Sequence, residues 1–303
     1  MNDTVHLHPL AQVFVIPSSV SVIEGGACLE HLNRILSVET LELPSLARKD
    51  GLICNANGRI LDSATICNLG SQVIILGNNG TGDETRQTIA SGIPWDEELV
   101  VKDADTAISH IILAGKAPSR CLAGLGIDTG ELMVEKWLEF GNSLISVNWR
   151  CANAIQILVP TSHCESLVSA LVENGAVTAD MNQWSRVRIL SGLLDEHELN
   201  PLNLPLELGL ENLVALNKGC YPGQEIHARM ESRGAQARSL VRLRSNDLLP
   251  EGKKKVEHIG TVTITDSCSY GGENIALAMI PNAAAEIEEF TFDDGSVASV
   301  ESI

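Results

Sequence analysis

The chain has 303 residues, of which 39 are acidic and 21 are basic, so its formal net charge is −18. This length is ample for two domains with hydrophobic cores of their own. The charge disfavours a general binder of nucleic-acid backbones, which needs a basic face, although it does not exclude a local basic patch. No apolar run approaches the ~20 residues that cross a bilayer.

Eight cysteines are spread along the chain, and none of them forms a Cys-x-x-Cys pair. We therefore predict no resident metal site, because zinc and cluster sites use closely spaced ligands. The N-terminus lacks the basic start and apolar core of a signal peptide, so we expect a cytoplasmic protein whose cysteines mostly stay reduced and behave as small apolar residues. We expect neither nucleic acid nor a membrane among its partners.

The first two thirds of the chain mix strand and helix patterns. In chain order, we predict a strand at 13–16, a helix at 27–36, strands at 52–54, 60–66 and 73–76, a helix at 84–90, strands at 107–113, 143–149 and 154–159, and helices at 162–173 and 181–190. Asn57-Gly58 predicts a hairpin between the second and third of these strands. The spacing in the helix at 162–173 predicts a buried face of Leu167, Val168, Leu171 and Val172.

Short strands dominate after residue 236, at 239–244, 260–265 and 275–280, and they predict a small antiparallel barrel or sandwich. We therefore expect an α+β protein with two parts, residues 1–235 and a C-terminal β-barrel at 236–303. The segment at 200–210, within the first part, is rich in Pro and Leu and reads as a packed loop.

One window of this acidic chain is basic. Residues 218–255 hold nine basic and four acidic side chains, a net charge of +5, whereas the flanking regions are acidic. Two interpretations remain open, a solvated surface or an anion site. In the interpretation as a solvated surface, the lysines at 253–255 lie in a loop after Pro250 and Gly252.

The segment Lys218-Gly219-Cys220-Tyr221-Pro222-Gly223-Gln224-Glu225 lies at the start of this window. Its two glycines allow a sharp turn, and Gln224 can begin a helix that extends to Met230. Cys220 precedes that helix and lies near Lys218 in sequence, and both features favour a thiolate. The alternative is a tight structural turn with a buried cysteine.

This segment, with Ala228-Arg229 and Arg233-Gly234, resembles the signature of the YgfZ-type folate-binding proteins. These proteins include mitochondrial homologues that act in iron–sulfur cluster assembly, and they are related to the glycine-cleavage T-protein, an aminomethyltransferase without this cysteine. Weaker resemblances cover the hairpin at 57–62, the helix at 184–192 with Arg188, the loop at 200–210 and the C-terminal strands.

The resemblance implies a folate-binding region of two subdomains plus a small barrel, around a channel that holds tetrahydrofolate. It implies an accessory protein that supports assembly or repair of iron–sulfur proteins, with assembly proteins or client enzymes as partners. Cys220 is then a reactive thiol or a shared, transient cluster ligand, and Asp62 a second catalytic candidate. The residues expected at the folate are Lys218, Gly219, Tyr221, Gly223, Gln224, Glu225, Arg188, Arg229 and Arg233.

The sequence also departs from the T-protein pattern. Paired acidic residues are usual in the T-protein hairpin, whereas here Asp62 is followed by Ser63, and residues 148–156 show no counterpart of its Gly-Glu-Asp-Gly-like segment. Two alternatives therefore stay open, a folate-dependent one-carbon transferase with Asp62 as its acid–base group and a non-catalytic interaction protein. Asp62 as an exposed hairpin residue and Arg188 as the partner of a structural carboxylate also stay open.

Overall fold

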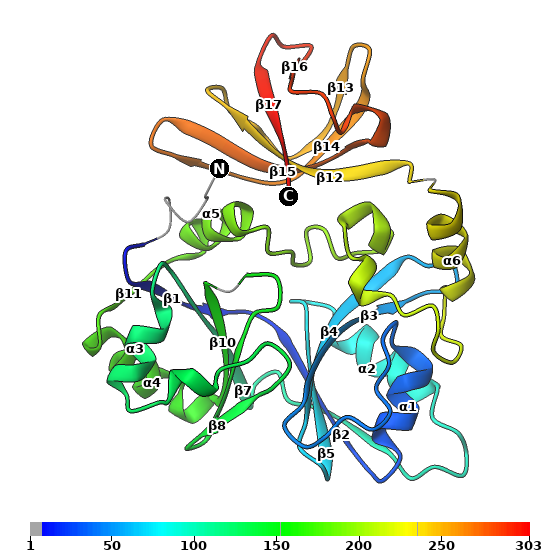
Figure 1. The fold of residues 1–303 in the computed structure, drawn as a ribbon, viewed down its shortest axis with the longest axis vertical. Helices are drawn as coiled ribbons and strands as arrows, with labels where there is room; N and C mark the ends of the chain where they lie inside the picture. The colour runs from blue at the N-terminus through cyan, green and yellow to red at the C-terminus, as the bar shows by residue number, and fades with distance from the viewer. Residues whose placement is uncertain (1–7, 152, 235) are drawn as a thin grey trace.

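The structure is a computed structural model, and it describes residues 8–151, 153–234 and 236–303. Its first sheet has six strands in the order β11-β1-β7-β10-β9-β8 (Figure 1). These strands are β1 (Ala11–Ile16), β7 (Ile108–Ala114), β8 (Leu138–Phe140), β9 (Ser143–Val147), β10 (Ala154–Pro160) and β11 (Ala176–Thr178). The helices α3 (Pro118–Gly124) and α4 (Thr161–Glu173) cover one face, where Leu122 and Leu171 join a cluster with Ile111 and Ile157.

The second sheet has the order β3-β4-β5-β2-β6. Its strands are β2 (Ser19–Glu24), β3 (Arg48–Cys54), β4 (Ile60–Asn68), β5 (Gln72–Gly77) and β6 (Val100–Asp103). Two helices, α1 (Cys28–Ile35) and α2 (Gly82–Ser91), pack on it, and Leu32, Ile35 and Ile89 enter one apolar cluster with its strands. Because β1 and β2 belong to different sheets, the chain crosses from one sheet to the other at Pro17 and Ser18.

The two sheets share a core. Val20 and Leu76 of the second sheet and Leu158 of the first pack around Trp137, which is fully buried. The indole N–H of Trp137 donates to the carbonyl oxygen of Ile66 at 3.0 Å. A buried indole nitrogen without such a partner would be costly, so this contact helps to fix how the sheets meet.

The helix α5 (Met181–Ser191) lies between the first sheet and the C-terminal sheet (Figure 1). It begins at a capping box formed by Asp180 and Gln183, and it ends at Gly192, which has a φ of 65°. Its apolar side packs on the first sheet, where Trp184 lies 5.3 Å from the ring of Phe14. After α5 the chain runs between the layers, with 3₁₀ turns at Pro205–Leu208 and Glu211–Leu213, to α6 (Gln224–Arg233).

The C-terminal part is a curled, open half-barrel, and the prediction of a closed barrel is wrong. Its strands are β12 (Arg238–Ser245), β13 (Gly252–Val256), β14 (Gly260–Tyr270), β15 (Glu273–Pro281), β16 (Glu289–Thr291) and β17 (Val297–Ser302), in the order β13-β14-β15-β12-β17-β16. The edge strands β13 and β16 pair only inward, with β14 and β17, so the sheet does not close. They span only five and three residues, which leaves little backbone to pair across the gap.

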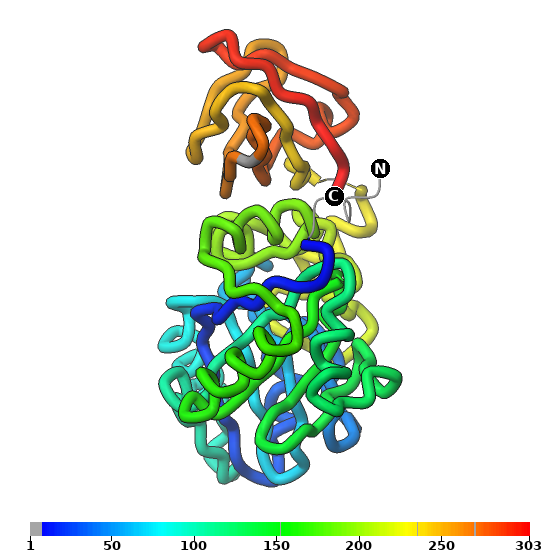
Figure 2. The backbone as a smooth tube through the Cα atoms, turned by 90° about the vertical axis from the view of Figure 1, so that its left-hand side faces the viewer, coloured from blue at the N-terminus to red at the C-terminus, as the bar shows by residue number. Residues whose placement is uncertain are grey.

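This sheet stands at one end of the long axis of the molecule (Figure 2). One side of it holds an apolar cluster of its own, and its other side packs on α5 and the loop after it. All six of its strands follow residue 236, where we expected the second part to begin. The boundary itself stays a prediction.

Most of the elements predicted from the pattern are present within one to a few residues of the expected ends. The elements that were not predicted are the helix α3 and the strands β2, β6, β8, β11, β13, β16 and β17. Val172 is exposed rather than buried, because only Leu171 on that turn of α4 reaches the core. The lysines at 253–255 lie in the edge strand β13 and not in a loop, and charged side chains on an edge strand discourage pairing with other chains.

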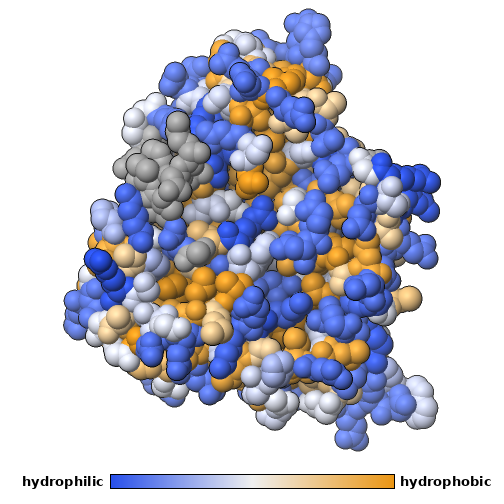
Figure 3. Space-filling model, in the orientation of Figure 1, coloured by the Kyte–Doolittle hydropathy of each residue, from blue (hydrophilic) through white to orange (hydrophobic). Residues whose placement is uncertain are grey.

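Hydrophilic side chains cover much of the face shown in Figure 3, and apolar side chains show in patches between them. Among the described helices, none is both long enough and apolar enough to cross a membrane.

Candidate functional site

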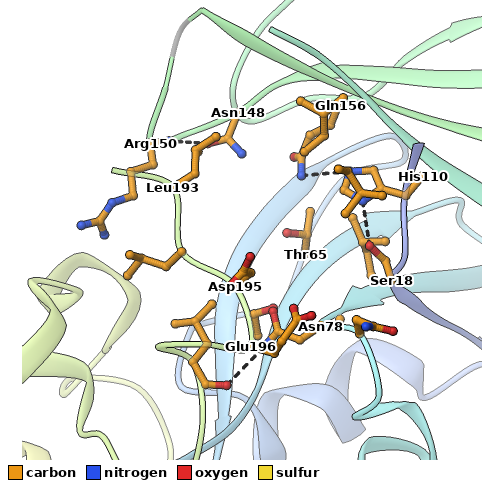
Figure 4. Close-up of a pocket in the computed structure, with 18 of the residues that line it drawn as sticks. Ser18, Thr65, Asn78, His110, Asn148, Arg150, Gln156, Leu193, Asp195 and Glu196 are labelled. Carbon is orange, nitrogen blue, oxygen red and sulfur yellow. Dashed lines mark hydrogen bonds between the residues drawn. The ribbon is translucent and has the colours of Figure 1, made fainter. Parts of the chain in front are cut away.

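A cavity of about 330 Å³ lies where the two sheets meet beneath α5 (Figure 4). Strands β3 and β4 form one wall, strands β7 and β10 form another, and the loop that follows α5 closes one side. This volume falls within the usual range for a small-molecule site. Much of the wall is apolar and includes Leu52, Leu76, Ile112, Trp184 and Leu193. Such walls suit a flat, weakly polar ring.

A chain of hydrogen bonds crosses the cavity wall from Ser18 to Gln156 (Figure 4). The Ser18 hydroxyl lies 2.9 Å from Nδ1 of His110, and the amide nitrogen of Gln156 lies 3.4 Å from Nε2 of the same ring. Burial, and then the charge of Arg48, lower the pKa of His110 to about 3, so this imidazole is neutral. The wall between the sheets is therefore polar at this point but uncharged.

Gln156 has an unused acceptor. Its side chain is 94 % buried, and its Oε1 has no hydrogen-bond partner. A buried amide oxygen without a partner costs about 1–3 kcal/mol, so a ligand that donates a hydrogen bond there is favoured. Gln156 lines the cavity, which makes it the strongest sign of a ligand in the described residues.

An ion pair on β3 forms a second polar part of the wall. The Arg48 guanidinium binds Asp50 through two contacts of 2.9 and 3.1 Å, and Thr65 donates to the same carboxylate at 2.7 Å. Arg48 also donates to the carbonyl oxygen of Val147 in the other sheet and stacks 5.5 Å from the ring of Trp137. Because Arg48 is fully engaged, it stabilises the junction of the sheets rather than offering a free cation.

The exposed rim of the cavity carries Asp195 and His197 in the loop after α5. Their side chains lie 2.7 Å apart, and the hydrogen bond that the His197 ring donates to Asp195 raises the pKa of His197 to about 9. Burial would raise the pKa of Asp195, but the hydrogen bond with His197 and the charge of Arg188 lower it. The rim therefore holds a cationic imidazole at neutral pH.

This raised pKa predicts a pH dependence of stability. The pKa of His197 is about 9 in the folded chain and 6.5 without its partner. The stabilisation that protonated His197 contributes to the folded state is therefore complete below pH 6.5, and it is lost as the pH rises through 9. Lys218, whose pKa burial lowers to about 8, acts in the opposite sense above pH 8. We therefore expect the loss to show as the difference between the wild type and His197→Gln in urea unfolding from pH 6 to pH 10.

The matched control is His163→Gln, at an exposed position on α4, which should follow the wild type at every pH. A constant difference between the wild type and His197→Gln over this range would show that His197 does not titrate as described.

Asp62, the second catalytic candidate, is fully buried and is not among the residues that line the cavity. Its carboxylate accepts from the backbone N–H of Asn78 at 2.9 Å and from the hydroxyl of Thr85 at 2.6 Å. Burial raises its pKa to about 6, although these hydrogen bonds act against the shift. Asp62 thus ties β4 to the start of α2, and its interpretation as an exposed hairpin residue is wrong.

Arg188 is the centre of a buried cluster of carboxylates. Its Nε lies 3.1 Å from Asp195, and its two terminal nitrogens each lie 2.5 Å from a carboxylate oxygen, of Glu198 and of Asp266. The interpretation of Arg188 as the partner of structural carboxylates is confirmed, and it joins α5 to the next loop and to β14. Through Asp195 this cluster reaches the cavity rim, but Arg188 itself does not line the cavity.

The glycines of the signature allow a close contact with the β3–β4 hairpin. Gly223 has a φ of 84°, and a Cβ there would lie 2.5 Å from the Cα of Gly58. His227 of α6 lies 2.8 Å from the carbonyl oxygen of Gly58 through Nε2, and its Nδ1 lies 3.2 Å from the hydroxyl of Tyr221. The signature is therefore joined to the hairpin whose strands form one cavity wall.

Lys218 and Gln224 hold the loop before α6. The Lys218 amine donates to the carbonyl oxygens of Asn33 and Val38, and the Gln224 amide donates to those of Leu216 and Lys218. Gly219, Cys220 and Glu225 are exposed. Cys220 thus lies on an anchored, accessible loop outside the cavity, and its interpretation as a buried turn residue is wrong.

Several basic side chains of the window pair with carboxylates. Arg238 binds Glu207, Arg242 and Arg244 bind Glu301, and Lys254 lies 3.4 Å from Asp294. Arg229 and Arg233 are exposed on α6 and do not line the cavity. The structure therefore brings none of the nine predicted cofactor residues into the cavity, and carboxylates balance only part of the positive charge of the window.

The cavity residues Ser18, His110 and Gln156 were missed by the sequence reasoning. A usable signal was present, because His110 and Gln156 each interrupt a strongly apolar strand. Polar residues in such buried strands need a partner, and an unexplained one marks a candidate site.

Comparison with known proteins places the fold and the family. No protein-family model matches the sequence. A chloroplastic protein of Arabidopsis thaliana named as a transferase is 31% identical over 254 residues, which are 78% of this chain but 57% of that protein. The tRNA-modifying protein YgfZ of Edwardsiella ictaluri is 26% identical over 77% of this chain and 74% of its own length.

A shorter match joins the chain to the mitochondrial iron–sulfur cluster assembly factor IBA57 of Saccharomyces cerevisiae, with 36% identity over 90 residues, 26% of this chain and 18% of that protein. Among solved structures, the aminomethyltransferase T of the glycine cleavage system from Bartonella henselae has the same fold, with a TM-score of 0.83 over 99% of this chain and 87% of that one at 18% identity. The chain is therefore a YgfZ-type member of the family that has the fold of aminomethyltransferase T.

Proposed function

We propose that the cavity binds tetrahydrofolate and that the protein supports the assembly or repair of iron–sulfur proteins. The observation that carries the folate part is the unpartnered Oε1 of Gln156 in a cavity with apolar walls. The pyrimidine half of a reduced pterin is flat and carries N–H donors along its edge, and one of them can satisfy this oxygen. When bound, tetrahydrofolate supplies a carrier for one-carbon units.

The remaining cavity residues fit this ligand. Leu52, Ile112 and Trp184 offer apolar surface to the pterin and benzoyl rings. At the rim, the cationic His197 and the guanidinium of Arg150, which stacks 5.7 Å from Trp149, can attract the glutamate carboxylates. The chain's own residues thus bind the ring at the bottom of the cavity and the acidic tail near solvent.

Cys220 is the candidate for the iron–sulfur part. It is exposed on a loop held by Lys218, Gln224 and the contact between Gly223 and Gly58. One cysteine can supply one ligand, and no group of three or more potential metal ligands is present in the described residues. A cluster held there would therefore need ligands from a partner protein or a small thiol, as expected for a transient role.

A direct transferase is less well supported. The relative named as a transferase and the aminomethyltransferase fold suggest it. However, Asp62 does not itself line the cavity, because its carboxylate is buried behind the lining residue Asn78 and accepts from Asn78 and Thr85. An assay for tetrahydrofolate-dependent aminomethyl transfer distinguishes the two functions.

We infer iron–sulfur enzymes as clients rather than direct contact with RNA. The name of the YgfZ relative refers to tRNA modification and that of the IBA57 relative to cluster assembly. An iron–sulfur enzyme that modifies tRNA would reconcile both names. The net charge of −18 also argues against RNA binding by this chain, and a cytoplasmic location remains part of the proposal.

Cys220→Ser separates the two parts of this function. Because Cys220 is exposed and lies outside the cavity, we expect the variant to fold and to bind tetrahydrofolate with unchanged affinity. In cells that depend on this protein, we expect a several-fold loss of activity of a [4Fe–4S] client enzyme. Cys164→Ser, at a half-buried cysteine on α4, is the matched control. Full client activity in Cys220→Ser would reject a role for the thiol.

A further inference from the structure

The loop between α2 and β6 exposes a tryptophan almost completely. Trp95 is 97% exposed, whereas Trp137 and Trp184 are buried. Large aromatic side chains that face water in an isolated chain are typical anchors of protein interfaces. The adjoining strand β6 also exposes Val100, so the apolar surface continues onto the sheet.

This loop is held firmly by its surroundings. Gly25 packs directly on the carbonyl oxygen of Glu98, since a Cβ at Gly25 would lie 2.4 Å from it. The carboxylate of Glu97 lies 2.7 Å from Arg34 of α1, and Leu99 packs against the core of the second sheet. Trp95 is therefore presented by an anchored backbone, which lowers the entropy lost when a partner binds.

The strand β6 is an open edge. It pairs with β2 on one side, and no described strand pairs with its other side. Every second residue of such a strand directs its N–H and C=O groups away from the sheet, where an extended chain can add by main-chain hydrogen bonds. An exposed aromatic residue beside such an edge gives an added strand both affinity and a defined position.

The charge of this surface selects the partner. From Asp96 to Asp105 the sequence holds five acidic residues and one basic residue. Lys102 is paired with Glu24, and Arg86 binds Asp105, while Asp96 and Glu98 are exposed. A strand that carries arginine or lysine is attracted here and can stack a cation on Trp95. An anionic lipid surface is repelled.

We propose that the Trp95 edge, defined as residues 95–103, binds an extended basic segment of a partner protein by strand addition. The Cys220 loop is anchored to the same helix, because Lys218 binds the carbonyl oxygen of Asn33 next to Arg34. A partner docked on the Trp95 edge therefore lies on the side of the molecule where α1 also holds the Cys220 loop (Figure 1). The docking itself does not depend on folate binding.

A synthetic peptide tests this proposal. The probe is an eight-residue peptide of alternating valine and arginine with blocked ends, and its counterpart has glutamate in place of arginine. We expect the arginine peptide to change the fluorescence of Trp95 and to slow amide hydrogen exchange at residues 100–103. The glutamate peptide should do neither.

Variants of the intact chain then locate the binding. We expect Trp95→Ala and Glu98→Lys each to weaken peptide binding about tenfold; for Trp95→Ala, which lacks the fluorescent side chain, binding is measured by hydrogen exchange. Leu202→Ala, at another exposed apolar side chain, should not change the binding. The proposal is overturned if the arginine peptide does not bind, if both peptides bind equally, or if Trp95→Ala binds as the wild type does. Binding of phosphatidylcholine vesicles through Trp95, without peptide binding, would assign the surface to lipid instead.

Discussion

Replacing Arg188 by methionine should lower the free energy of unfolding by about 3–5 kcal/mol. The guanidinium is 1% exposed and faces three carboxylates, those of Asp195, Glu198 and Asp266. Methionine fills similar space but leaves these groups without a counter-charge in a buried place. Urea unfolding at pH 7 measures the loss, and we expect it to be the largest of any single change considered.

Two further variants make this result specific. Arg34→Met removes a guanidinium from an exposed ion pair with Glu97 and should cost less than about 1 kcal/mol. Adding Glu198→Gln to Arg188→Met removes one of the stranded charges and should recover part of the stability. A loss below about 1 kcal/mol for Arg188→Met would contradict a structural role and would reopen a direct contact with ligand.

Arg188 also shows what the sequence could and could not predict. The helix that carries it was predicted from spacing, and a structural pairing was one of two interpretations of the residue. Its three carboxylate partners, however, lie 7, 10 and 78 residues further along the chain, and Asp266 belongs to the C-terminal sheet. The local sequence pattern does not encode such ion pairs, because these pairs depend on how the layers of the fold stack.

The signature segment at 218–225 likewise has features that the sequence predicted and one contact that it did not. Asn57-Gly58 predicted the hairpin, and the glycines on both sides of Cys220 predicted a turn before a helix, and both are present. The requirement for Gly223 is nevertheless set by Gly58, which lies 165 residues earlier in the chain. The motif was thus located correctly, but its contact with the hairpin could not be read from it.

The cavity was the hardest feature to predict. The expected ligand residues came from the family resemblance, and all of them except Arg188 lie in the basic window, yet none of them lines the cavity. The residues that line the cavity instead include His110 and Gln156, which are neutral polar residues on apolar strands. Net charge in sequence is a poor guide when the balancing acids lie far away along the chain.

Replacing Gln156 by leucine should weaken the binding of tetrahydrofolate about 10- to 100-fold. The reason is that Oε1 of Gln156 is buried without a partner, and a donor of the ligand that meets it gains about 1–3 kcal/mol. Leucine keeps most of the volume of the side chain but offers no acceptor. Its effect on folding is checked by urea unfolding, which should change little, since the variant removes the unpartnered Oε1 together with the long 3.4 Å contact to His110, and these two effects oppose each other.

The most direct measurement is a calorimetric titration with tetrahydrofolate of the wild type, Gln156→Leu and the double variant Arg229→Glu/Arg233→Glu. The cavity assignment predicts binding to the wild type, a 10- to 100-fold loss for Gln156→Leu, and little change for the double variant, whose exposed residues lie outside the cavity. Unchanged affinity in Gln156→Leu together with a large loss in the double variant would place the ligand on α6 instead. No binding to the folded wild type would contradict folate binding altogether.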